Sequence, residues 1–257
     1  MLELKNIYKY YNPGTVNEMC LFRDFCLKVE KGEFVSVVGS NGSGKTSMLN
    51  IICGSIPVET GRVRIGGRDI TREKEYRRNG RIGRVYQNPA MGTCPSMTIL
   101  ENMSLADNKG GTYGFRRGTN KKRTAYYREL LSRLNLGLED KLEVKAGSLS
   151  GGQRQAMALI MSTMTPIDFL ILDEHTAALD PKTAELIMEL TDKIVKEEGL
   201  TTIMVTHNLR YAMEYGNRLL MMHQGEVILD QKEVEKSSMS VEDVLTLFHE
   251  ISIECGN

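Results

Sequence analysis

The chain has 257 residues, of which 41% are hydrophobic and 26% are charged. This length suits one large domain or two small ones, and the composition excludes both an intrinsically disordered chain and a fibrous repeat. The 33 Lys and Arg residues balance the 33 Asp and Glu residues, whereas a protein that binds nucleic acid in general is basic overall. We therefore expect a folded, soluble chain with no nucleic-acid partner.

Targeting signals and covalent cross-links are not evident in the sequence. No apolar run approaches the roughly 18 residues that a membrane-spanning helix needs, and residues 1–12 lack the apolar region of a secretory signal. The five cysteines form no C-x-x-C pair, and the four histidines form no H-E-x-x-H motif. We therefore expect a cytoplasmic chain without a disulfide framework, a zinc cluster or a metalloprotease site.

Short extended segments dominate the first part of the chain. They alternate apolar and polar residues, or form brief apolar runs between turn residues, which is the pattern of β-strands. A glycine-rich loop interrupts them and is followed by a predicted helix over residues 47–54. We predict strands over residues 2–11, 25–33, 34–39, 62–70 and 80–87.

Helical patterns prevail from about Pro89 to Pro166. After Pro166, strand-like segments alternate with helices, which predicts a mostly parallel sheet with crossover helices. The predicted helices cover residues 96–106, 124–136, 151–164, 181–199 and 241–255, with a short helix through Tyr211, and the predicted strands cover residues 169–173, 201–207, 218–224 and 226–230.

The segment GSNGSGKT, from Gly39 to Thr46, fits the P-loop pattern G-x-x-x-x-G-K-[ST] between a predicted strand and a predicted helix. Its glycines let backbone N–H groups surround phosphate oxygens, and the following helix adds its positive end. Lys45 is expected to reach the β- and γ-phosphates, and the Thr46 hydroxyl to bind Mg²⁺. A dinucleotide-binding loop is the alternative, but the full glycine spacing fails and this alternative leaves Lys45 and Thr46 without a role.

Two carboxylates follow the apolar strand FLILD at its carboxyl end, where parallel sheets bind ligands. Asp173 is expected to hold Mg²⁺, and Glu174 to polarise or deprotonate the water that attacks the γ-phosphate. Without a P-loop in the same chain, an Asp-Glu pair at the end of a strand most often has no catalytic role. Together with a P-loop, it predicts a hydrolysis site.

Six motifs occur in an order that resembles the nucleotide-binding domain of ATP-binding cassette (ABC) transporters. They are the P-loop, Gln87, the LSGGQ segment at residues 149–153, the Asp-Glu pair, Asp180 in AALD and His207 in VTHN. The resemblance extends from Leu2 to about Asp230. It implies an α/β P-loop NTPase with a RecA-like core and mostly parallel sheet, an N-terminal antiparallel β subdomain and an inserted α-helical subdomain that carries the signature motif.

The resemblance also implies the domain organisation. Residues 1–257 form a single ABC ATPase domain, in which residues 1–88 and 167–257 make the catalytic core with its β subdomain and residues 89–166 make the helical insertion. In this family two cassettes sandwich two ATP molecules, and each ATP contacts the P-loop of one subunit and the signature of the other. The partner is a second copy of this chain or a paralogous cassette.

Site residues follow from the matching motifs. The resemblance implies catalytic roles for Glu174, His207, Lys45 and Gln87, Mg²⁺ binding by Thr46, Gln87 and Asp173, and communication between the two sites through Asp180. It implies ATP binding by Tyr11, Gly39, Ser40, Asn41, Gly42, Ser43, Gly44, Lys45, Thr46 and Ser47, and contact with the partner's ATP by Leu149, Ser150, Gly151, Gly152 and Gln153.

Two of these site assignments need comment. Tyr11 is expected to stack on adenine, while Tyr8, Tyr10 and a purely structural role for the aromatic ring stay open as alternatives. His175 departs from the family, in which proline commonly follows the Asp-Glu pair. It lies outside the expected catalytic atoms, so we expect no loss of function.

A cassette without membrane helices is expected to serve a transporter whose permease subunits are separate, at the cytoplasmic face of the membrane. Residues 11–34 look like a subgroup that works with an extracytoplasmic substrate-binding protein to import amino acids. A lipoprotein-release or macrolide-type exporter is the alternative. Soluble ABC ATPases of translation or DNA repair are disfavoured because the chain has neither a second cassette nor a coiled-coil insertion. A P-loop kinase or GTPase is also disfavoured, because neither would explain the LSGGQ segment.

A basic, glycine-rich segment covers residues 107–123 and contains Arg116, Arg117, Lys121, Lys122 and Arg123. The simplest interpretation is a solvated loop between two helices. Contact with anionic lipid or with an acidic partner surface is the alternative. The permease is expected to dock near Gln87 and residues 88–97.

Overall fold

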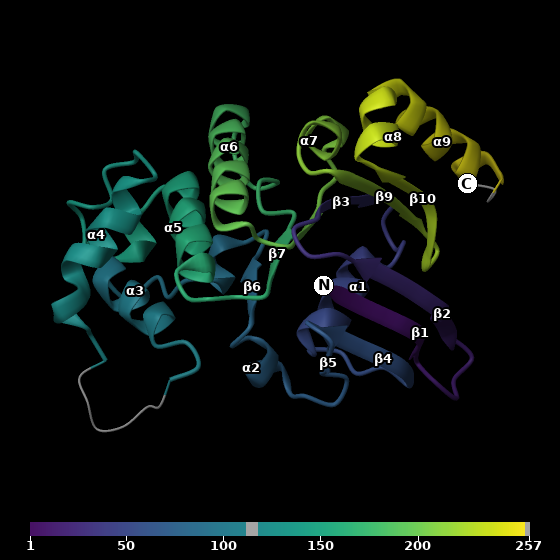
Figure 1. Cartoon of the computed structure of the whole chain (residues 1–257), viewed down its shortest axis with the longest axis horizontal. Coiled ribbons are helices and arrows are strands. Elements are labelled where there is room, and N and C mark those ends of the chain that lie inside the picture. Colours follow the sequence, from purple (N-terminus) through teal and green to yellow (C-terminus); the bar gives the residue numbers. More distant parts are fainter. Residues whose placement is uncertain (112–117, 255–257) are drawn as a thin grey trace. The chain divides into compact units, whose positions relative to one another are not determined.

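The computed structural model describes residues 1–111 and 118–254 (Figure 1). The chain divides into two compact units, the first formed by residues 1–78 and 199–257 and the second by residues 79–198. The subdomain boundaries expected from the sequence, at residues 88/89 and 166/167, stay a prediction. No helix in the described part of the chain is long and apolar enough to cross a membrane.

An antiparallel sheet begins the first unit. Its strands are β1 (Leu2–Tyr11), β2 (Met19–Val29), β4 (Thr60–Ile65) and β5 (Arg68–Asp69), in the order β2-β1-β4-β5. The buried residues Leu2 and Leu4 alternate with less buried ones. The alternation then shifts by one residue at Asn6, whose φ of 50° lies in the left-handed region. The register shift between Leu4 and Ile7 returns Ile7 to the buried face.

Parallel strands form the second layer of the first unit. β3 (Phe34–Gly39) pairs in parallel with β8 (Thr202–Val205) and β9 (Arg218–His223), and β10 (Glu226–Lys232) is antiparallel to β9. All six residues of β3 are buried, as expected for a strand covered on both faces.

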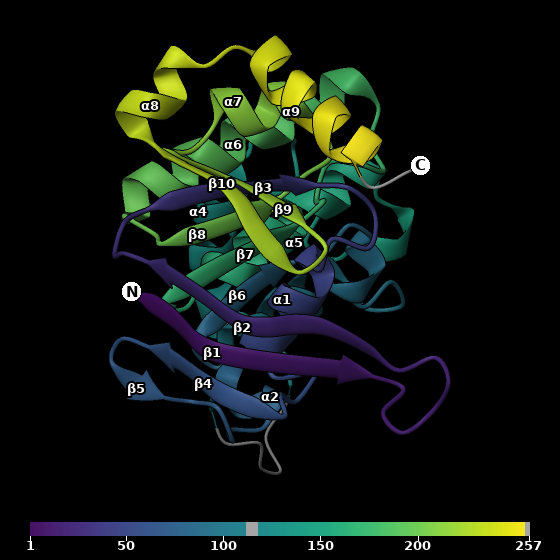
Figure 2. The same cartoon turned by 90° about the vertical axis from the view of Figure 1, so that its right-hand side faces the viewer.

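The described part of the first unit also contains the helices α1 (Lys45–Cys53), α2 (Glu75–Arg78), α7 (Leu209–Glu214), α8 (Glu233–Ser238) and α9 (Val241–Glu254). In Figure 2, α7, α8 and α9 lie on one side of β3, β9 and β10, and α1 lies on the other. A buried cluster of Val38, Ala212, Leu219, Met221 and Val244 joins α7 and α9 to the strands.

Arg218, at the start of β9, connects three segments of the first unit. Its side chain is 7% exposed and donates to the Lys28 carbonyl at 2.7 Å, to Glu33 Oε2 at 2.8 Å, and to both carboxylate oxygens of Asp230 at 2.7 Å. The bonds to the carboxylates raise the pKa of the guanidinium, with the Asp230 hydrogen bonds as the main cause.

Arg218→Met is expected to lower the free energy of unfolding by about 3 kcal/mol, because it leaves the half-buried Glu33 carboxylate without its main cation. Urea unfolding of the full chain measures this loss. Arg210→Met, which removes an exposed cation from α7, is the control and is expected to cost under about 0.5 kcal/mol. An equal loss in the two variants would contradict the structural role of Arg218.

The second unit combines one strand pair with helices. β6 (Ile82–Val85) is parallel to β7 (Phe169–Asp173), and the α-helices are α3 (Ile99–Asp107), α4 (Thr124–Ser132), α5 (Gly151–Thr163) and α6 (Pro181–Glu198). Short 3₁₀ helices cover Pro89–Met91, Lys121–Arg123 and Ala146–Ser148.

Most predicted elements are present, but several boundaries were wrong. The strand predicted from residue 25 begins at Met19, and two predicted helices are shorter than expected, α3 beginning at Ile99 and α4 ending at Ser132. Thr98 explains the first helix boundary, since it forms a capping box with Glu101 that fixes where the helix starts. The short helices α2 and α8 were not predicted.

Candidate active site

The P-loop lies in the first unit, between β3 and α1. Lys45 is 5% exposed, and its ammonium donates to the carbonyls of Gly39 at 2.7 Å and Ser40 at 2.8 Å and to Ser43 Oγ at 3.3 Å. The loop therefore folds around its own lysine, whose ammonium is held by two loop carbonyls and one hydroxyl.

The amino end of α1 is open to an anion. Its N-cap is Gly44, in the left-handed region with a φ of 102°, and no side chain caps the helix. The first-turn N–H groups and the positive end of the helix dipole are consequently available for phosphate. Thr46 in this turn is exposed.

The turn of the β9–β10 hairpin is hydrogen-bonded to the P-loop. The Gly225 N–H donates to the Ser43 carbonyl at 3.0 Å. Gln224 and Gly225 have φ values of 43° and 83°, which a two-residue hairpin turn with both central residues left-handed requires. A Cβ on Gly44 would lie 3.0 Å from the Phe22 ring, so the loop is also closely packed on β2.

Tyr11 lies next to the P-loop helix. Its hydroxyl is 2.9 Å from Ser47 Oγ, and its ring is half-buried. The Lys9 ammonium lies 5.6 Å from the ring centroid. The contact with Ser47 favours Tyr11 over Tyr8 and Tyr10 as the aromatic ring nearest the nucleotide, although its stacking on adenine stays a prediction.

His207 follows β8 at the same sheet edge as the P-loop. β8 is parallel to β3 and the Thr206 N–H donates to the Val37 carbonyl at 3.1 Å, so the strands end together. His207 is exposed, and the neighbouring turn is fixed by the Asn208 N–H, which donates to Thr206 Oγ1 at 3.0 Å. The structure thus places His207 in the same unit as Lys45, at the carboxyl ends of adjacent strands.

In the second unit, Asp173 ends β7 and is paired with Arg84 of β6. The Arg84 Nη2 donates to Asp173 Oδ2 at 2.7 Å, and the two side chains are 10% and 14% exposed. The guanidinium also lies 4.7 Å from the centroid of the Tyr86 ring. The sequence did not single out Arg84; its only signal was a charged residue in an otherwise apolar strand.

We expect Arg84 and Asp173 to be coupled by about 2 kcal/mol in a double-mutant cycle of Arg84→Met and Asp173→Asn, because the pair is short and largely shielded from water. Urea unfolding without nucleotide and Mg²⁺ gives the coupling free energy. The same cycle on the more exposed pair Lys196 and Asp192, 2.7 Å apart on α6, is the control and is expected to give under about 0.5 kcal/mol. Coupling of the buried pair no larger than that of the control would contradict the prediction.

Glu174 follows Asp173 in an unusual backbone conformation. Its φ is 48°, in the left-handed region, and its carbonyl accepts from the Ala177 N–H at 3.0 Å in a tight turn. A non-glycine residue in this region is uncommon and such residues often occur at functional sites. The side chain is half-buried.

His175 has a structural environment. It is 2% exposed, and its Nε2 lies 3.2 Å from Thr191 Oγ1 on α6. Burial lowers the pKa of this histidine to about 4. The neutral imidazole therefore joins the turn after Glu174 to α6.

Gln87 lies just beyond β6, the neighbour of β7. Val85 is paired with Leu172, so Gln87 and Asp173 follow adjacent strand ends in the same unit. Gln87 is exposed, whereas the preceding backbone is fixed, because Gln155 Nε2 donates to the Tyr86 carbonyl at 3.0 Å. This bond connects the Gln87 segment to α5, the helix that begins at the signature.

The signature segment begins α5 with a capping box. Ser150 Oγ accepts from the Gln153 N–H, and Gln153 Oε1 accepts from the Ser150 N–H, both at 3.2 Å. Gly152 lies against α6, since a Cβ there would be 2.1 Å from Thr183 Cγ2. Leu149 is buried, while Gly151 is exposed at the start of the helix.

Asp180 immediately precedes α6. Its Oδ1 accepts from the Thr183 N–H at 3.2 Å, and the hydrogen bonds from Thr183 lower the pKa of the carboxyl. The side chain is exposed. Asp180 therefore stays ionised at the surface, and its communication role stays a prediction.

The predicted Mg²⁺ ligands supply a hydroxyl (Thr46), an amide carbonyl (Gln87) and a carboxylate (Asp173). These hard oxygen donors are the ligands that Mg²⁺ prefers, with water and phosphate completing its shell. Thr46 belongs to the first unit and the other two to the second. No group of three or more His, Cys, Asp and Glu side chains within the described residues could hold a metal ion. The donor chemistry fits an ion that is bound mainly through a nucleotide.

The basic segment at residues 107–123 is only partly described. Arg116 and Arg117 lie outside the described residues. Arg123 has a structural role, since its Nε lies 2.9 Å from Asp107 and its guanidinium lies 4.3 Å from the Tyr126 ring centroid.

Comparison with known proteins gives consistent matches along the chain. A family model described as "ABC transporter" matches residues 22–177. The chain is 47% identical over 248 residues to the tyrosine transport ATP-binding protein of Clostridioides difficile (strain R20291), with 96% of this chain and 98% of that protein covered. It is 32% identical to a phosphonates import ATP-binding protein of Lactobacillus johnsonii, with 95% of each covered.

The fold is similar to that of solved structures. One is a dimeric ATP-binding cassette in a post-hydrolysis state bound to ADP and Pi. It has a TM-score of 0.76 and 33% sequence identity, and the match covers 91% of this chain and 99% of that chain.

Proposed function

Because the chain belongs to the ABC transporter family, we propose that it is the ATP-hydrolysing subunit of a transporter that imports a small solute such as an amino acid. Membership of this family confirms the predicted α/β P-loop NTPase fold and the ABC-type ATPase activity. The finer assignments, namely the direction of transport, the solute, the partners and the role of each site residue, belong to the proposal.

The observation that carries the proposal is the 47% identity over almost the whole chain to a protein named for tyrosine transport. A relative named for phosphonate import is 32% identical. The larger identity favours an amino acid over a phosphonate as the solute. The solute does not contact the cassette in this proposal, so the permease determines specificity.

We propose these roles for the site residues. Lys45, Thr46 and the amides of the P-loop bind the phosphates and Mg²⁺, and Tyr11 stacks on adenine. Asp173 and Gln87 complete the Mg²⁺ ligands when the ion is bound with ATP. Glu174 accepts a proton from the attacking water, and His207 contacts the γ-phosphate.

The partners follow from the same proposal. Two cassettes bind ATP between the P-loop of one and the signature of the other, at residues 149–153. Permease subunits in the membrane dock near Gln87 and residues 88–97, which places the cassette at the cytoplasmic face. An extracytoplasmic binding protein delivers the solute.

Solute uptake tests the proposal. Cells that express the chain together with a candidate permease and binding protein are expected to accumulate radiolabelled tyrosine, and uptake is expected to stop with Glu174→Gln. Phosphonate uptake alone would assign a different solute. Faster loss of solute from preloaded cells would assign export and contradict the proposed direction.

A further inference from the structure

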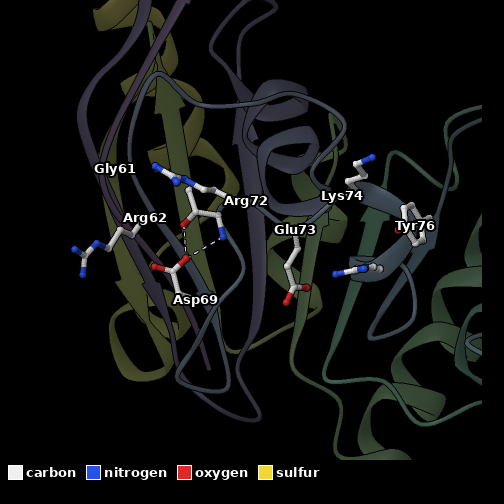
Figure 3. Close-up of a pocket in the computed structure, with 9 residues that line it drawn as sticks. Gly61, Arg62, Asp69, Arg72, Glu73, Lys74 and Tyr76 are labelled. Carbon is white, nitrogen blue, oxygen red and sulfur yellow. Dashed lines mark hydrogen bonds between the residues drawn. The ribbon is translucent and has the colours of Figure 1, made fainter.

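A cavity of about 760 Å³ lies in the first unit, away from the P-loop motif (Figure 3). It is formed by β4, β5, α2 and the segment that connects them. Its volume is within the range of small-molecule sites, roughly 300 to 1,000 Å³. The lining residues are Gly61, Arg62, Asp69, Thr71, Arg72, Glu73, Lys74, Tyr76 and Arg77.

The lining carries four cations and two carboxylates. Figure 3 shows Arg62 and Arg72 on the Asp69 side of the cavity and Lys74 and Tyr76 on the opposite side, with Glu73 between them. The four cations are all exposed, and they outnumber the two carboxylates, so the lining is positively charged. An anion of more than one charge is the ligand that such a lining favours.

Both carboxylates are already engaged. Asp69 Oδ1 accepts from the Thr71 hydroxyl at 2.6 Å and from the Thr71 N–H at 2.9 Å, and these bonds lower the pKa of its carboxyl. Glu73 is paired at 2.6 Å with Arg68, which does not line the cavity. By contrast, Arg62, Arg72, Lys74 and Arg77 form no ion pair within residues 1–111 and 118–254.

The wall of the cavity is fixed by a buried residue. Arg78 is 4% exposed and donates to the Thr71 carbonyl at 2.8 Å and to the Glu73 carbonyl at 3.0 Å. The same guanidinium donates to the carbonyls of Ile51 at 2.7 Å and Ile52 at 3.0 Å, at the carboxyl end of α1. The backbone of the connecting segment is therefore anchored to the end of α1, while the side chains of Arg72, Lys74 and Arg77 are exposed.

An aromatic ring lies at the edge of the cavity. Tyr76 is 67% exposed, and the Arg77 guanidinium lies 5.9 Å from its centroid. An exposed aromatic ring next to guanidinium groups is suited to stack on a planar base while the cations bind phosphate.

We propose that this cavity binds an organic phosphate of nucleotide class, at a site separate from the P-loop. Arg62, Arg72, Lys74 and Arg77 bind the phosphate groups, and Tyr76 stacks on the base.

Calorimetric titration of the full chain with inorganic pyrophosphate tests the phosphate part. Lys45→Ala removes phosphate binding at the P-loop and leaves the cavity site. In this background, adding Arg72→Ala and Arg77→Ala is expected to weaken pyrophosphate binding at least tenfold. The matched control adds Lys121→Ala and Arg128→Ala, which removes the same charge from exposed positions of the second unit, and is expected to change affinity less than twofold.

Two results would overturn the phosphate part: no pyrophosphate binding by the Lys45→Ala chain, or equal affinities of the cavity and control variants. Circular dichroism checks that both fold. Since no step requires hydrolysis or transport, failure here leaves the proposed function intact, and failure of uptake leaves this site intact.

A second titration tests the base. AMP binding to the Lys45→Ala chain is expected to weaken about fivefold with Tyr76→Ala, while pyrophosphate binding is unchanged. Equal AMP affinity with and without the tyrosine ring would contradict stacking.

Flotation with phosphatidylglycerol and phosphatidylcholine vesicles distinguishes a lipid phosphate from a soluble one. We expect the cavity and control variants to float equally. The proposal would be overturned if only the cavity variant lost binding to the vesicles and if pyrophosphate did not compete with the vesicles for the wild-type chain. The cavity would then bind lipid headgroups at the membrane surface.

Discussion

A Glu174→Gln chain is expected to bind ATP with unchanged affinity and to hydrolyse it at least 100-fold more slowly. The amide has the shape of the carboxylate but cannot accept a proton from the attacking water, and loss of a general base typically costs about 10² to 10⁴ in rate. Glu174 already has the left-handed φ of 48°, so a residue of the same shape keeps the turn. Phosphate release by the assembled transporter measures the rate, and calorimetry measures the affinity.

Glu189→Gln is the control for the loss of one carboxylate. Glu189 is exposed on α6 and outside the proposed site, so its substitution is expected to leave the rate within about twofold. A Glu174→Gln chain with a rate within threefold of the wild type would show that Glu174 does not activate the water. Loss of ATP affinity together with the rate would assign Glu174 to binding instead.

The same variant tests the dimer. If ATP is bound between the P-loop of one cassette and the signature of its partner, preventing hydrolysis keeps the two together. Light scattering of Glu174→Gln with Mg²⁺ and ATP is therefore expected to give twice the monomer mass, and Ser150→Arg, which places a bulky cation at the signature, is expected to abolish this dimer. A persistent dimer with Ser150→Arg would contradict the proposed place of the signature.

Local sequence predicted the P-loop and several elements well. β1 and β3 begin and end at the predicted residues, and α1 ends at Cys53, followed by Gly54 as a left-handed C-cap. Each of these features depends on residues within one short segment: an alternating pattern, an apolar run or a glycine in a conformation that it tolerates. Element ends that depend only on such local signals were consequently predicted correctly.

Long-range contacts could not be predicted in the same way. Arg84 and Asp173 are 89 residues apart, and their pairing depends on the register of β6 beside β7. The anchoring of the cavity wall by Arg78 likewise needs the carbonyls of Ile51 and Ile52, which only the tertiary structure brings near. The family motifs predict which residues bind ATP, but they do not predict what holds those residues in place.

The support behind the P-loop is the clearest example. Gly225→Ala is expected to lower the free energy of unfolding by roughly 4 kcal/mol and to weaken ATP binding at least tenfold. A Cβ at Gly225 would lie only 1.7 Å from the Leu21 carbonyl oxygen, so the hairpin must shift away from β2. That shift also breaks the bond from the Gly225 N–H to the Ser43 carbonyl of the P-loop.

Gly67→Ala is the control that separates the effect of this clash from the backbone strain of any alanine in the left-handed region. Gly67 has a φ of 79°, close to the 83° of Gly225, and also lies in a hairpin turn, but a Cβ there has no neighbour within 4 Å. The control is therefore expected to lose only about 1 kcal/mol and to bind ATP as the wild type does. Urea unfolding and ATP calorimetry measure both quantities. Equal losses in the two variants would mean that the hairpin does not hold the P-loop, because backbone strain alone would then account for the effect at Gly225.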